Sequence, residues 1–288
     1  MSSRSEPPTR EQPGLLTRPI PASGERLPAI GLGSWQAFDI GDEPEARARR
    51  AEVLRRFFAA GGRLIDSSPM YGRAESVIGS LLPEAAGGDE AFIATKVWTR
   101  GRAEGVAQMQ DSTRKLGGRV DLMQVHNLVD TDTQLETLRA WKREGRIRYL
   151  GVTHYRRAAF DALERLIESA ELDFVQLPYS ALTRAAERRL LPAAADHGVA
   201  VLVMRPFEGG ELFELVHGRE TPAWARELGC SSWAQLALKF ILGHPAVTCP
   251  IPATSSPEHL DDNMSALTGP LPDAKQRERI AAAIRGEG

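Results

Sequence analysis

The chain has 288 residues, of which 42% are hydrophobic and 26% charged, a balance typical of a globular protein with a large core. Its 36 basic residues are offset by 38 acidic ones, for a formal charge of −2, so we expect neither nucleic acid nor a membrane as partner. The length would allow two domains, but a (β/α)8 barrel needs about 250 residues as one unit, and one domain is the better expectation.

The number and spacing of cysteines and histidines argue against two further kinds of protein, those held by disulfides and those with a metal site. Only Cys230 and Cys249 occur, and no histidines cluster at ligand spacing, so neither a disulfide framework nor a metal site is expected. Residues 1–18 contain prolines and polar side chains but no apolar run long enough for a signal peptide. We therefore expect a cytoplasmic protein in which residues 1–16 form a flexible tail and residues 17–288 a single domain.

The predicted elements begin with a β-hairpin at residues 17–28, placed to cap the bottom of a barrel. Eight short aliphatic runs then predict strands: residues 29–33, 63–67, 91–96, 121–126, 148–152, 173–177, 199–204 and 247–251. Helical spacing between them predicts seven helices: residues 44–60, 74–82, 103–116, 133–144, 157–170, 185–197 and 232–242. This alternation predicts a parallel α/β sheet, and the lack of GxGxxG after the first strand favours a closed (β/α)8 TIM barrel over an open doubly wound sheet.

Four side chains that can hold or move a proton follow successive predicted strands: Asp66, Tyr71, Lys96 and His126. In a β/α barrel those strand ends converge on one mouth. A tyrosine acting as general acid near neutrality needs its pKa of about 10 lowered by about 3 units. Lys96, held in place by Asp66, is the expected cause of that lowering. His126 could orient a carbonyl oxygen or share the proton of the tyrosine.

Each of these residues also has a structural interpretation when taken alone. Asp66 could cap a strand end, and Lys96 could complete an ion pair. Tyr71 could be a packed aromatic residue with a hydrated hydroxyl group, and His126 a hydrogen-bonded core histidine. The occurrence of all four in order favours a catalytic constellation.

The order of aspartate, tyrosine–glycine, threonine–lysine and histidine resembles the aldo-keto reductase family, in the form of a bacterial-type member with short loops. Residues 31–36, 151–153, 251–252 and Asn263 extend the resemblance over most of the chain. It implies a reductase that converts aldehydes or ketones to alcohols with hydride from NADPH, with NADH also possible. It further implies that Tyr71 is the general acid, that Lys96 and Asp66 tune it, and that His126 positions the substrate.

The same resemblance implies a set of cofactor-binding residues. They are Ser34, Trp35, Asp66, Thr153, His154, Gln176, Met204, Arg205, Pro206, Phe207, Gly209, Gly210, Thr254, Ser255, His259, Asp262 and Asn263. His154 stands in place of an asparagine and lacks the paired donor and acceptor of an amide. Met204 stands in place of a tyrosine that stacks on the nicotinamide, and Arg205 beside it could gain a phosphate contact.

Cofactor preference is expected to be less strict than in strongly NADPH-preferring members. Such members carry a lysine where Ala253 stands and an arginine where His259 stands. A 2′-phosphate would then depend on Thr254, Ser255 and helix-end amides. We expect an enzyme that prefers NADPH, but with a smaller preference over NADH than those members have.

The substrate pocket is expected to be apolar and open. Trp35, Met70 and Trp98 lie near His126, and the loops at 127–131 and after residue 263 are short. The expected partner is a small-molecule carbonyl compound, and the expected state a monomer or weak homo-oligomer. Two other functions stay open: a cofactor-binding regulatory subunit with weak or no turnover, and an unrelated barrel hydrolase or lyase that uses Asp66 and His126.

Overall fold

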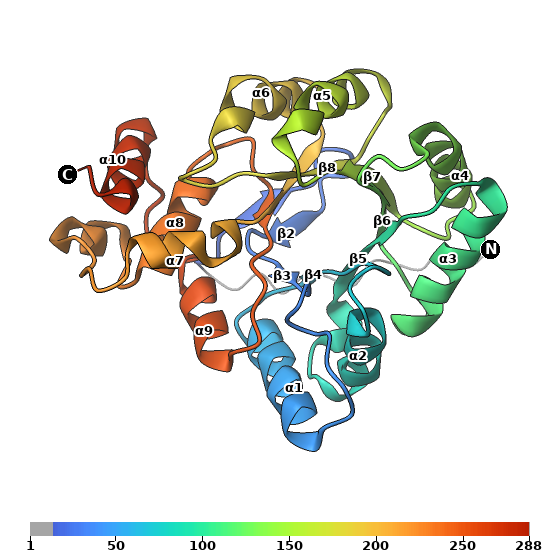
Figure 1. The fold of residues 1–288 in the computed structure, drawn as a ribbon, viewed down its shortest axis with the longest axis horizontal. Helices are drawn as coiled ribbons and strands as arrows, with labels where there is room; N and C mark the ends of the chain where they lie inside the picture. Colours follow the sequence, from blue (N-terminus) through green and yellow to red (C-terminus); the bar gives the residue numbers. More distant parts are fainter. Residues whose placement is uncertain (1–13, 288) are drawn as a thin grey trace.

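A computed structural model describes residues 14–287, in which eight parallel strands form a curled sheet surrounded by helices (Figure 1). The strands are β3 (Leu32–Gly33), β4 (Leu64–Asp66), β5 (Phe92–Val97), β6 (Leu122–His126), β7 (Tyr149–Thr153), β8 (Phe174–Pro178), β9 (Ala200–Met204) and β10 (Cys249–Pro250). Each overlaps a predicted strand, and neighbours in sequence pair in parallel from β3 to β10.

The last strand returns to the first, which closes the barrel. Gly31 N–H donates to the carbonyl oxygen of Pro250 at 2.9 Å, and Gly33 N–H donates to that of Pro252 at 3.0 Å. A parallel bridge joins Gly33 to Ala253. The predicted (β/α)8 TIM barrel is therefore confirmed.

The predicted hairpin is also confirmed, as β1 (Thr17–Pro19) and β2 (Arg26–Pro28) paired antiparallel. Ile20 and Leu27 are fully buried in a cluster with Phe92 and Phe174 from the barrel interior. The hairpin therefore supplies apolar side chains that fill one end of the barrel and leave the other end for polar groups. Of the segment predicted as a tail, residues 1–13 lie outside the described residues, and Leu16 N–H donates to Leu267 O at 3.1 Å.

All seven predicted helices occur, and three more follow them or lie between them. The α-helices are α1 (Pro44–Ala59), α2 (Ala74–Leu81), α3 (Arg102–Lys115), α4 (Thr131–Arg143), α5 (Phe160–Ser169), α6 (Leu190–Asp196), α7 (Glu211–Leu215), α8 (Trp233–Leu242), α9 (Pro257–Ser265) and α10 (Ala274–Arg285). Short 3-10 helices lie at Leu82–Glu84, Gly88–Glu90, Arg157–Ala159, Ala185–Arg188, Glu208–Gly210 and Ala223–Leu228. Among residues 14–287, no helix is long and apolar enough to cross a membrane.

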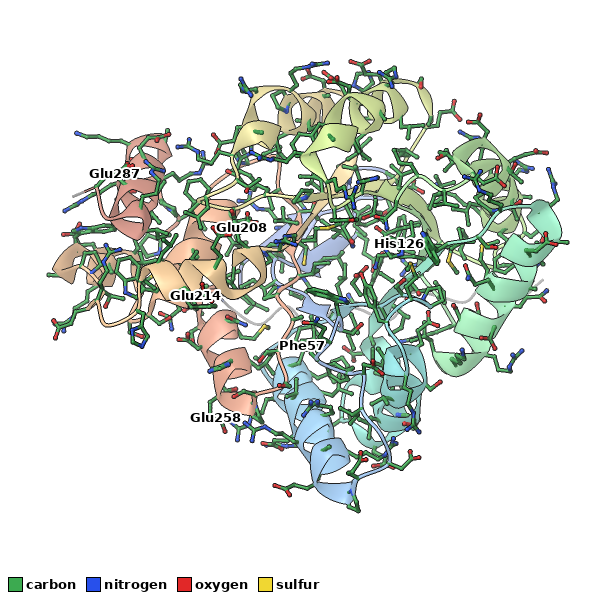
Figure 2. The ribbon with its side chains drawn as sticks, in the orientation of Figure 1. Phe57, His126, Glu208, Glu214, Glu258 and Glu287 are labelled. Carbon is green, nitrogen blue, oxygen red and sulfur yellow. The ribbon has the colours of Figure 1, made fainter. Side chains whose placement is uncertain are left out.

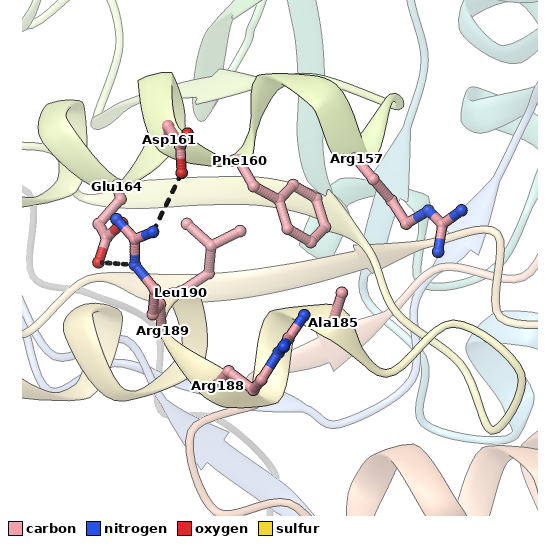
Figure 3. Close-up of a pocket in the computed structure, with 8 residues that line it drawn as sticks. All are labelled: Arg157, Phe160, Asp161, Glu164, Ala185, Arg188, Arg189 and Leu190. Atoms are coloured by element: carbon pink, nitrogen blue, oxygen red, sulfur yellow. Dashed lines mark hydrogen bonds and ion pairs between the residues drawn. The ribbon is translucent and has the colours of Figure 1, made fainter.

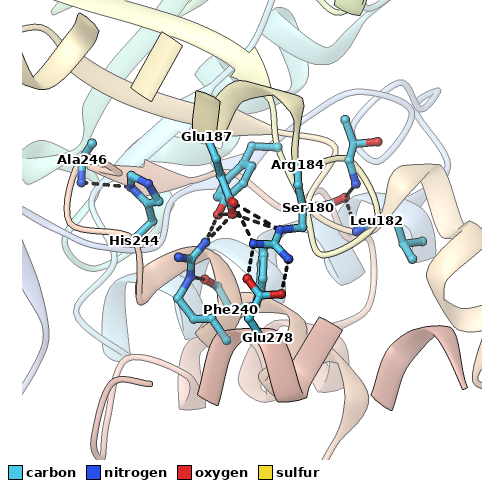
Figure 4. Close-up of polar contacts among 11 residues, drawn as sticks. Ser180, Leu182, Arg184, Glu187, Phe240, His244, Ala246 and Glu278 are labelled. Atoms are coloured by element: carbon cyan, nitrogen blue, oxygen red, sulfur yellow. Dashed lines mark hydrogen bonds and ion pairs between the residues drawn. The ribbon is translucent and has the colours of Figure 1, made fainter. Parts of the chain in front are cut away.

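A charged cluster attaches the C-terminal helix α10 to the barrel (Figure 4). Arg277 of α10 donates to Glu187 at 2.5 Å and also contacts the hydroxyl of Tyr179, which directly follows β8. Arg184 joins Glu187 at 2.8 Å to Glu278 at 2.5 Å. Because Arg277 is largely buried and paired with Glu187, this cluster fixes α10 against the outside of the strand-end loops.

Candidate active site

The carboxyl ends of the strands surround a cavity of about 720 Å³. It is lined by Gly33, Ser34, Trp35, Gln36, Asp66, Met70, Tyr71, His126, Asn127, Tyr155, Gln176, Met204, Arg205, Pro206, Phe207, Gly209, Gly210, Phe213, Ile251, Pro252 and Ala253. Figure 2 shows His126 and Glu208 on either side of this region. The cavity has the position expected of a binding site in a β/α barrel.

A second hollow, of about 480 Å³, lies on the outside of the barrel between α5 and α6 (Figure 3). Its Arg189 is paired with Asp161 at 3.2 Å and with Glu164. The strand ends and their buried charges are elsewhere, so we take the cavity at the mouth as the candidate site.

The centre of the site is an ion pair between neighbouring strands. Lys96 Nζ on β5 donates to Asp66 Oδ2 on β4 at 2.6 Å and to the carbonyl oxygen of Ser67 at 2.7 Å. The exposed fraction is 0% for Lys96 and 2% for Asp66. Burial lowers the pKa of Lys96, but the charge of Asp66 and its hydrogen bond outweigh burial, so the pKa lies above its usual value. The lysine is therefore a buried ammonium ion.

Two amide side chains complete the shell around Asp66. Gln176 Nε2 donates to Asp66 Oδ1 at 2.9 Å, and Gln124 Nε2 donates to the same oxygen at 3.2 Å. Gln124 stands opposite Lys96 in the register of β5 and β6. Sequence analysis missed Gln124, although its place two residues before His126 on the same strand put it on the same side of the sheet.

Tyr71 lies beside the ammonium group, with Lys96 Nζ 5.1 Å from the centroid of its ring. Gly72 next to it has φ of +58°, and a Cβ there would lie 2.3 Å from the carboxylate of Asp39. Glycine adopts this left-handed conformation without strain, which favours the turn that presents Tyr71 at the mouth.

The expected lowering of the tyrosine pKa below its normal value is wrong for the protein alone. Burial raises the pKa of Tyr71, and the charge of Lys96 opposes this without reversing it. Desolvation disfavours a phenolate more than one ammonium ion at this distance favours it. Tyr71 is therefore a protonated phenol near neutral pH, held where a positive charge can stabilise the anion that proton loss would leave.

His126 ends β6 next to the tyrosine, with the two rings 6.1 Å apart and nearly perpendicular. Burial, followed by the charges of Lys96 and His154, lowers the pKa of His126 to about 3. Ser68 Oγ lies 3.0 Å from His126 Nδ1. The imidazole at the cavity wall is therefore neutral. Ser68 was not singled out from the sequence, because nothing in a loop serine shows which ring it will meet.

Three of the predicted cofactor-binding residues, Thr153, His154 and Gln176, have hydrogen-bond partners within the chain. Thr153 Oγ1 donates to Gln176 Oε1 at 3.2 Å, while the other end of the same amide contacts Asp66. His154 Nδ1 accepts the N–H of Arg156 at 3.0 Å, and its ring stacks on Tyr155. The structure places Gln176 in the cavity lining but neither Thr153 nor His154.

The other predicted cofactor-binding residues lie just before α9 or within it, outside the cavity lining: Thr254, Ser255, His259, Asp262 and Asn263. Ser256 caps that helix by accepting the N–H of His259 at 3.3 Å. Asp262 accepts from Ser232 at 2.8 Å and from Gln235 at 2.7 Å, contacts that join α8 and α9. The structure therefore gives Asp262 a role in packing α8 against α9, and its predicted contact with the cofactor stays a prediction.

The predicted substrate wall is placed only in part. Trp35 and Met70 line the cavity and are 50% and 42% exposed, whereas Trp98 is not among the lining residues. Tyr155 and Phe213, each 41% exposed, also line the cavity. Tyr155 follows a strand end, which could have indicated it, but Phe213 lies on α7, a helix that sequence analysis did not predict.

The family model described as the Aldo/keto reductase family matches residues 29–285. The chain belongs to the aldo/keto reductase family. Its resemblance to that family is thereby confirmed.

Individual members of the aldo/keto reductase family are similar to this chain at moderate identity. Aldo-keto reductase YhdN of Bacillus subtilis (strain 168) is 28% identical over 200 residues, which are 64% of this chain and 60% of that protein. NADH-specific methylglyoxal reductase of Escherichia coli (strain K12) is 25% identical over 89% of this chain and 94% of its own length. The crystal structure of an aldo-keto reductase from Klebsiella pneumoniae in complex with NADPH has a TM-score of 0.74 at 26% identity, covering 91% of this chain and 93% of that one.

The neutrality of His126 gives a pH prediction. With a pKa of about 3, the ring should show no titration between about pH 5 and pH 8, where a free histidine is half protonated near 6.5. The unfolded chain binds that proton and the folded chain does not. The contribution of neutral His126 to the free energy of unfolding is therefore complete above pH 6.5. It declines as the pH falls toward 3, by at most about 1.4 kcal/mol per pH unit.

Imidazole NMR of the free protein, with His126→Gln to assign the signal, measures this titration. A midpoint near 6.5 would contradict the described environment of the ring.

Proposed function

We propose that the protein is an NAD(P)H-dependent carbonyl reductase that converts aldehydes or ketones to alcohols, with Tyr71 as the general acid. The observation that carries the proposal is the buried ammonium of Lys96, paired with Asp66 at 2.6 Å and 5.1 Å from the Tyr71 ring centroid, at the mouth of the barrel. A protonated phenol next to a fixed positive charge is suited to donate a proton to an oxygen that becomes negative.

The cavity residues suit a dinucleotide. Gly209 and Gly210 line the cavity with φ of +72° and +110°, and a Cβ on Gly210 would meet nothing within 4 Å. Backbone in this conformation, without side chains, lets amide groups approach a pyrophosphate closely. Arg205 stands at the same wall, where its guanidinium lies 3.6 Å from the carboxylate of Glu208. When bound, the reduced nicotinamide supplies the hydride.

The chain's own residues then perform the proton transfer. Neutral His126 provides a hydrogen bond that orients the carbonyl oxygen toward Tyr71. As negative charge develops on that oxygen, Tyr71 Oη gives up its proton to it, and the ammonium of Lys96 stabilises the phenolate that remains. Asp66 keeps Lys96 charged throughout, because its carboxylate is the partner of that ammonium.

The substrate side of the cavity is apolar and aromatic. Trp35, Met70, Tyr155 and Phe213 are all between 41% and 50% exposed around it. Such a rim favours small apolar or aromatic carbonyl compounds, whose burial removes apolar surface from water. We propose such a molecule as the partner and a monomer as the active unit, since the four proposed catalytic residues come from one chain.

The direct test is the loss of reduced-cofactor absorbance with NADPH and NADH in parallel, against a panel of aldehydes, ketones and quinones. Turnover with at least one class supports the reductase. Tight cofactor binding without turnover would instead indicate a regulatory subunit, and a lack of cofactor binding would indicate an unrelated barrel enzyme.

Replacement of the proposed general acid separates binding from chemistry. Tyr71→Phe removes only the hydroxyl, so kcat should fall by at least about 100-fold. The dissociation constant of NADPH, measured by quenching of tryptophan fluorescence, should stay within about threefold, because the ring and its packing remain. Strong residual turnover in this variant would remove Tyr71 from the mechanism.

A preference for NADPH is supported by a cation that sequence analysis did not place. Arg49 of α1 reaches the start of α9, where its Nε donates to the carbonyl oxygen of Ser255 at 3.2 Å. The carboxylate of Glu258 lies 3.6 Å from the guanidinium group of Arg49, and the Arg49 side chain is 54% exposed. This guanidinium compensates for the positive charges missing at Ala253 and His259, so we propose it as the partner of a 2′-phosphate.

Arg49→Ala should raise the KM for NADPH about fivefold, the size of one partly exposed charge contact, and leave the KM for NADH nearly unchanged. Arg56→Ala is the matched control, since Arg56 also joins α1 to α9, through Asp261 at 2.6 Å, without reaching Ser255. An equal effect of the two variants on both cofactors would assign Arg49 to helix packing alone.

A further inference from the structure

Ser68 is placed to act on His126 from a position that the proposed mechanism does not use. It follows β4 by two residues and is fully buried. Its Oγ lies 3.0 Å from His126 Nδ1 and accepts the N–H of Met70 at 3.2 Å. The serine therefore connects the loop that carries Tyr71 to the ring at the end of β6.

The direction of the serine–histidine hydrogen bond follows from counting donors and acceptors. The N–H of Met70 can only donate, so Ser68 Oγ is already an acceptor. If Nδ1 also carried a hydrogen, the buried hydroxyl of Ser68 would accept twice and donate to nothing among residues 14–287. An unsatisfied buried donor costs about 1–3 kcal/mol. The favoured arrangement has the hydroxyl donating to an unprotonated Nδ1.

Burial of the ring, together with the charges around it, excludes the alternative of a doubly protonated imidazole. Lys96 from β5 is a buried ammonium ion, and His154 after β7 is the other titratable group that acts on the ring from a neighbouring strand end. Both oppose a second proton on His126. Asp66, the nearby anion, is already paired with Lys96 at 2.6 Å. The one property left to be set is which ring nitrogen carries the hydrogen.

We propose that Ser68 is a positioning residue that holds His126 as its Nε2–H tautomer, so that the ring presents a hydrogen-bond donor to the substrate carbonyl oxygen. This inference rests on the proposed reductase function. The opposite tautomer would turn a nitrogen lone pair toward the carbonyl oxygen, which repels it and weakens orientation of the substrate.

The tautomer can be measured without any turnover. Long-range ¹H–¹⁵N correlation spectra of the labelled free protein distinguish a protonated from an unprotonated ring nitrogen, and His126→Gln assigns the signal. Wild type should show Nε2 protonated and Nδ1 unprotonated. Ser68→Ala should populate the Nδ1–H form, because the proton donor to Nδ1 is gone. An Nδ1–H tautomer in wild type, or an unchanged tautomer in Ser68→Ala, would overturn the proposal.

Kinetics should follow the spectra. Ser68→Ala should lower kcat about tenfold while the KM for NADPH stays near wild type, since the loss lies in substrate orientation. Ser68→Thr retains the hydroxyl and should restore both the tautomer and kcat. Ser67→Ala is the matched control for loss of a buried hydroxyl in the same loop, because Ser67 Oγ accepts from Ser34 at 2.9 Å and not from His126. It should leave the tautomer unchanged.

The outcomes separate this inference from the proposed function. Absence of turnover in wild type, together with the Nε2–H tautomer and its loss in Ser68→Ala, would reject the reductase and keep the role of Ser68 toward the ring. Turnover in wild type, together with a tautomer that does not change in Ser68→Ala, would keep the reductase and reject the role of Ser68 toward the ring. Should Ser68→Ala not fold, the wild-type spectrum still tests the proposal, because Nδ1–H there rejects it. Ser68→Cys, a weaker donor of similar size, should then shift part of the population toward Nδ1–H, and a tautomer population unchanged from wild type would reject the proposal.

Discussion

The burial of one ammonium ion constrains the rest of the site. Lys96 is 0% exposed inside the barrel, and an ion removed from water in this way costs several kcal/mol unless it is paired and hydrogen-bonded. Asp66 and the carbonyl oxygen of Ser67 meet that requirement at 2.6 and 2.7 Å. Asp66 in turn requires donors for its second oxygen, which Gln124 and Gln176 provide. Strands β4, β5, β6 and β8 are thereby joined through the ion pair of Asp66 and Lys96.

Burial explains why both neighbours of that charge are neutral. Burial disfavours a second proton on His126, with the positive charge of Lys96 adding to that effect, and burial keeps the proton on Tyr71 against the opposing effect of the same charge. The site thus contains an uncharged phenol and an uncharged imidazole beside a fixed cation. Such a site stabilises negative charge that develops on a substrate oxygen. The rigid barrel keeps this arrangement in place before any ligand binds, which is the condition for electrostatic preorganisation.

The sequence predicted the barrel, its hairpin and the four polar strand ends because these features are local. Alternating apolar runs fix strands and helices, and the parallel topology then brings the strand ends together. Partner choice among side chains is not local. Ser68 meets His126 across 58 residues, and Arg49 meets Ser255 across 206. A sequence pattern assigns a residue to a face of an element but does not determine which distant group it meets.

The errors have the same origin. The charge of Lys96 suggested a lowered pKa for Tyr71, but the degree of burial that outweighs it depends on packing by residues far along the chain. Trp98 follows its strand as predicted and is 41% exposed, yet the structure does not place it in the cavity lining. Phe213 lines the cavity from α7, a helix of five residues that is too short to give a periodic signal.

The most direct measurement of the central claim is the fate of deuterium placed at both C4 positions of the reduced nicotinamide, followed by mass spectrometry of the product alcohol. The account predicts one deuterium bound to the former carbonyl carbon, together with a hydroxyl proton that exchanges with water. Conversion of the substrate without deuterium in the product would contradict it, and would show that Asp66, Lys96, Tyr71 and His126 serve another reaction.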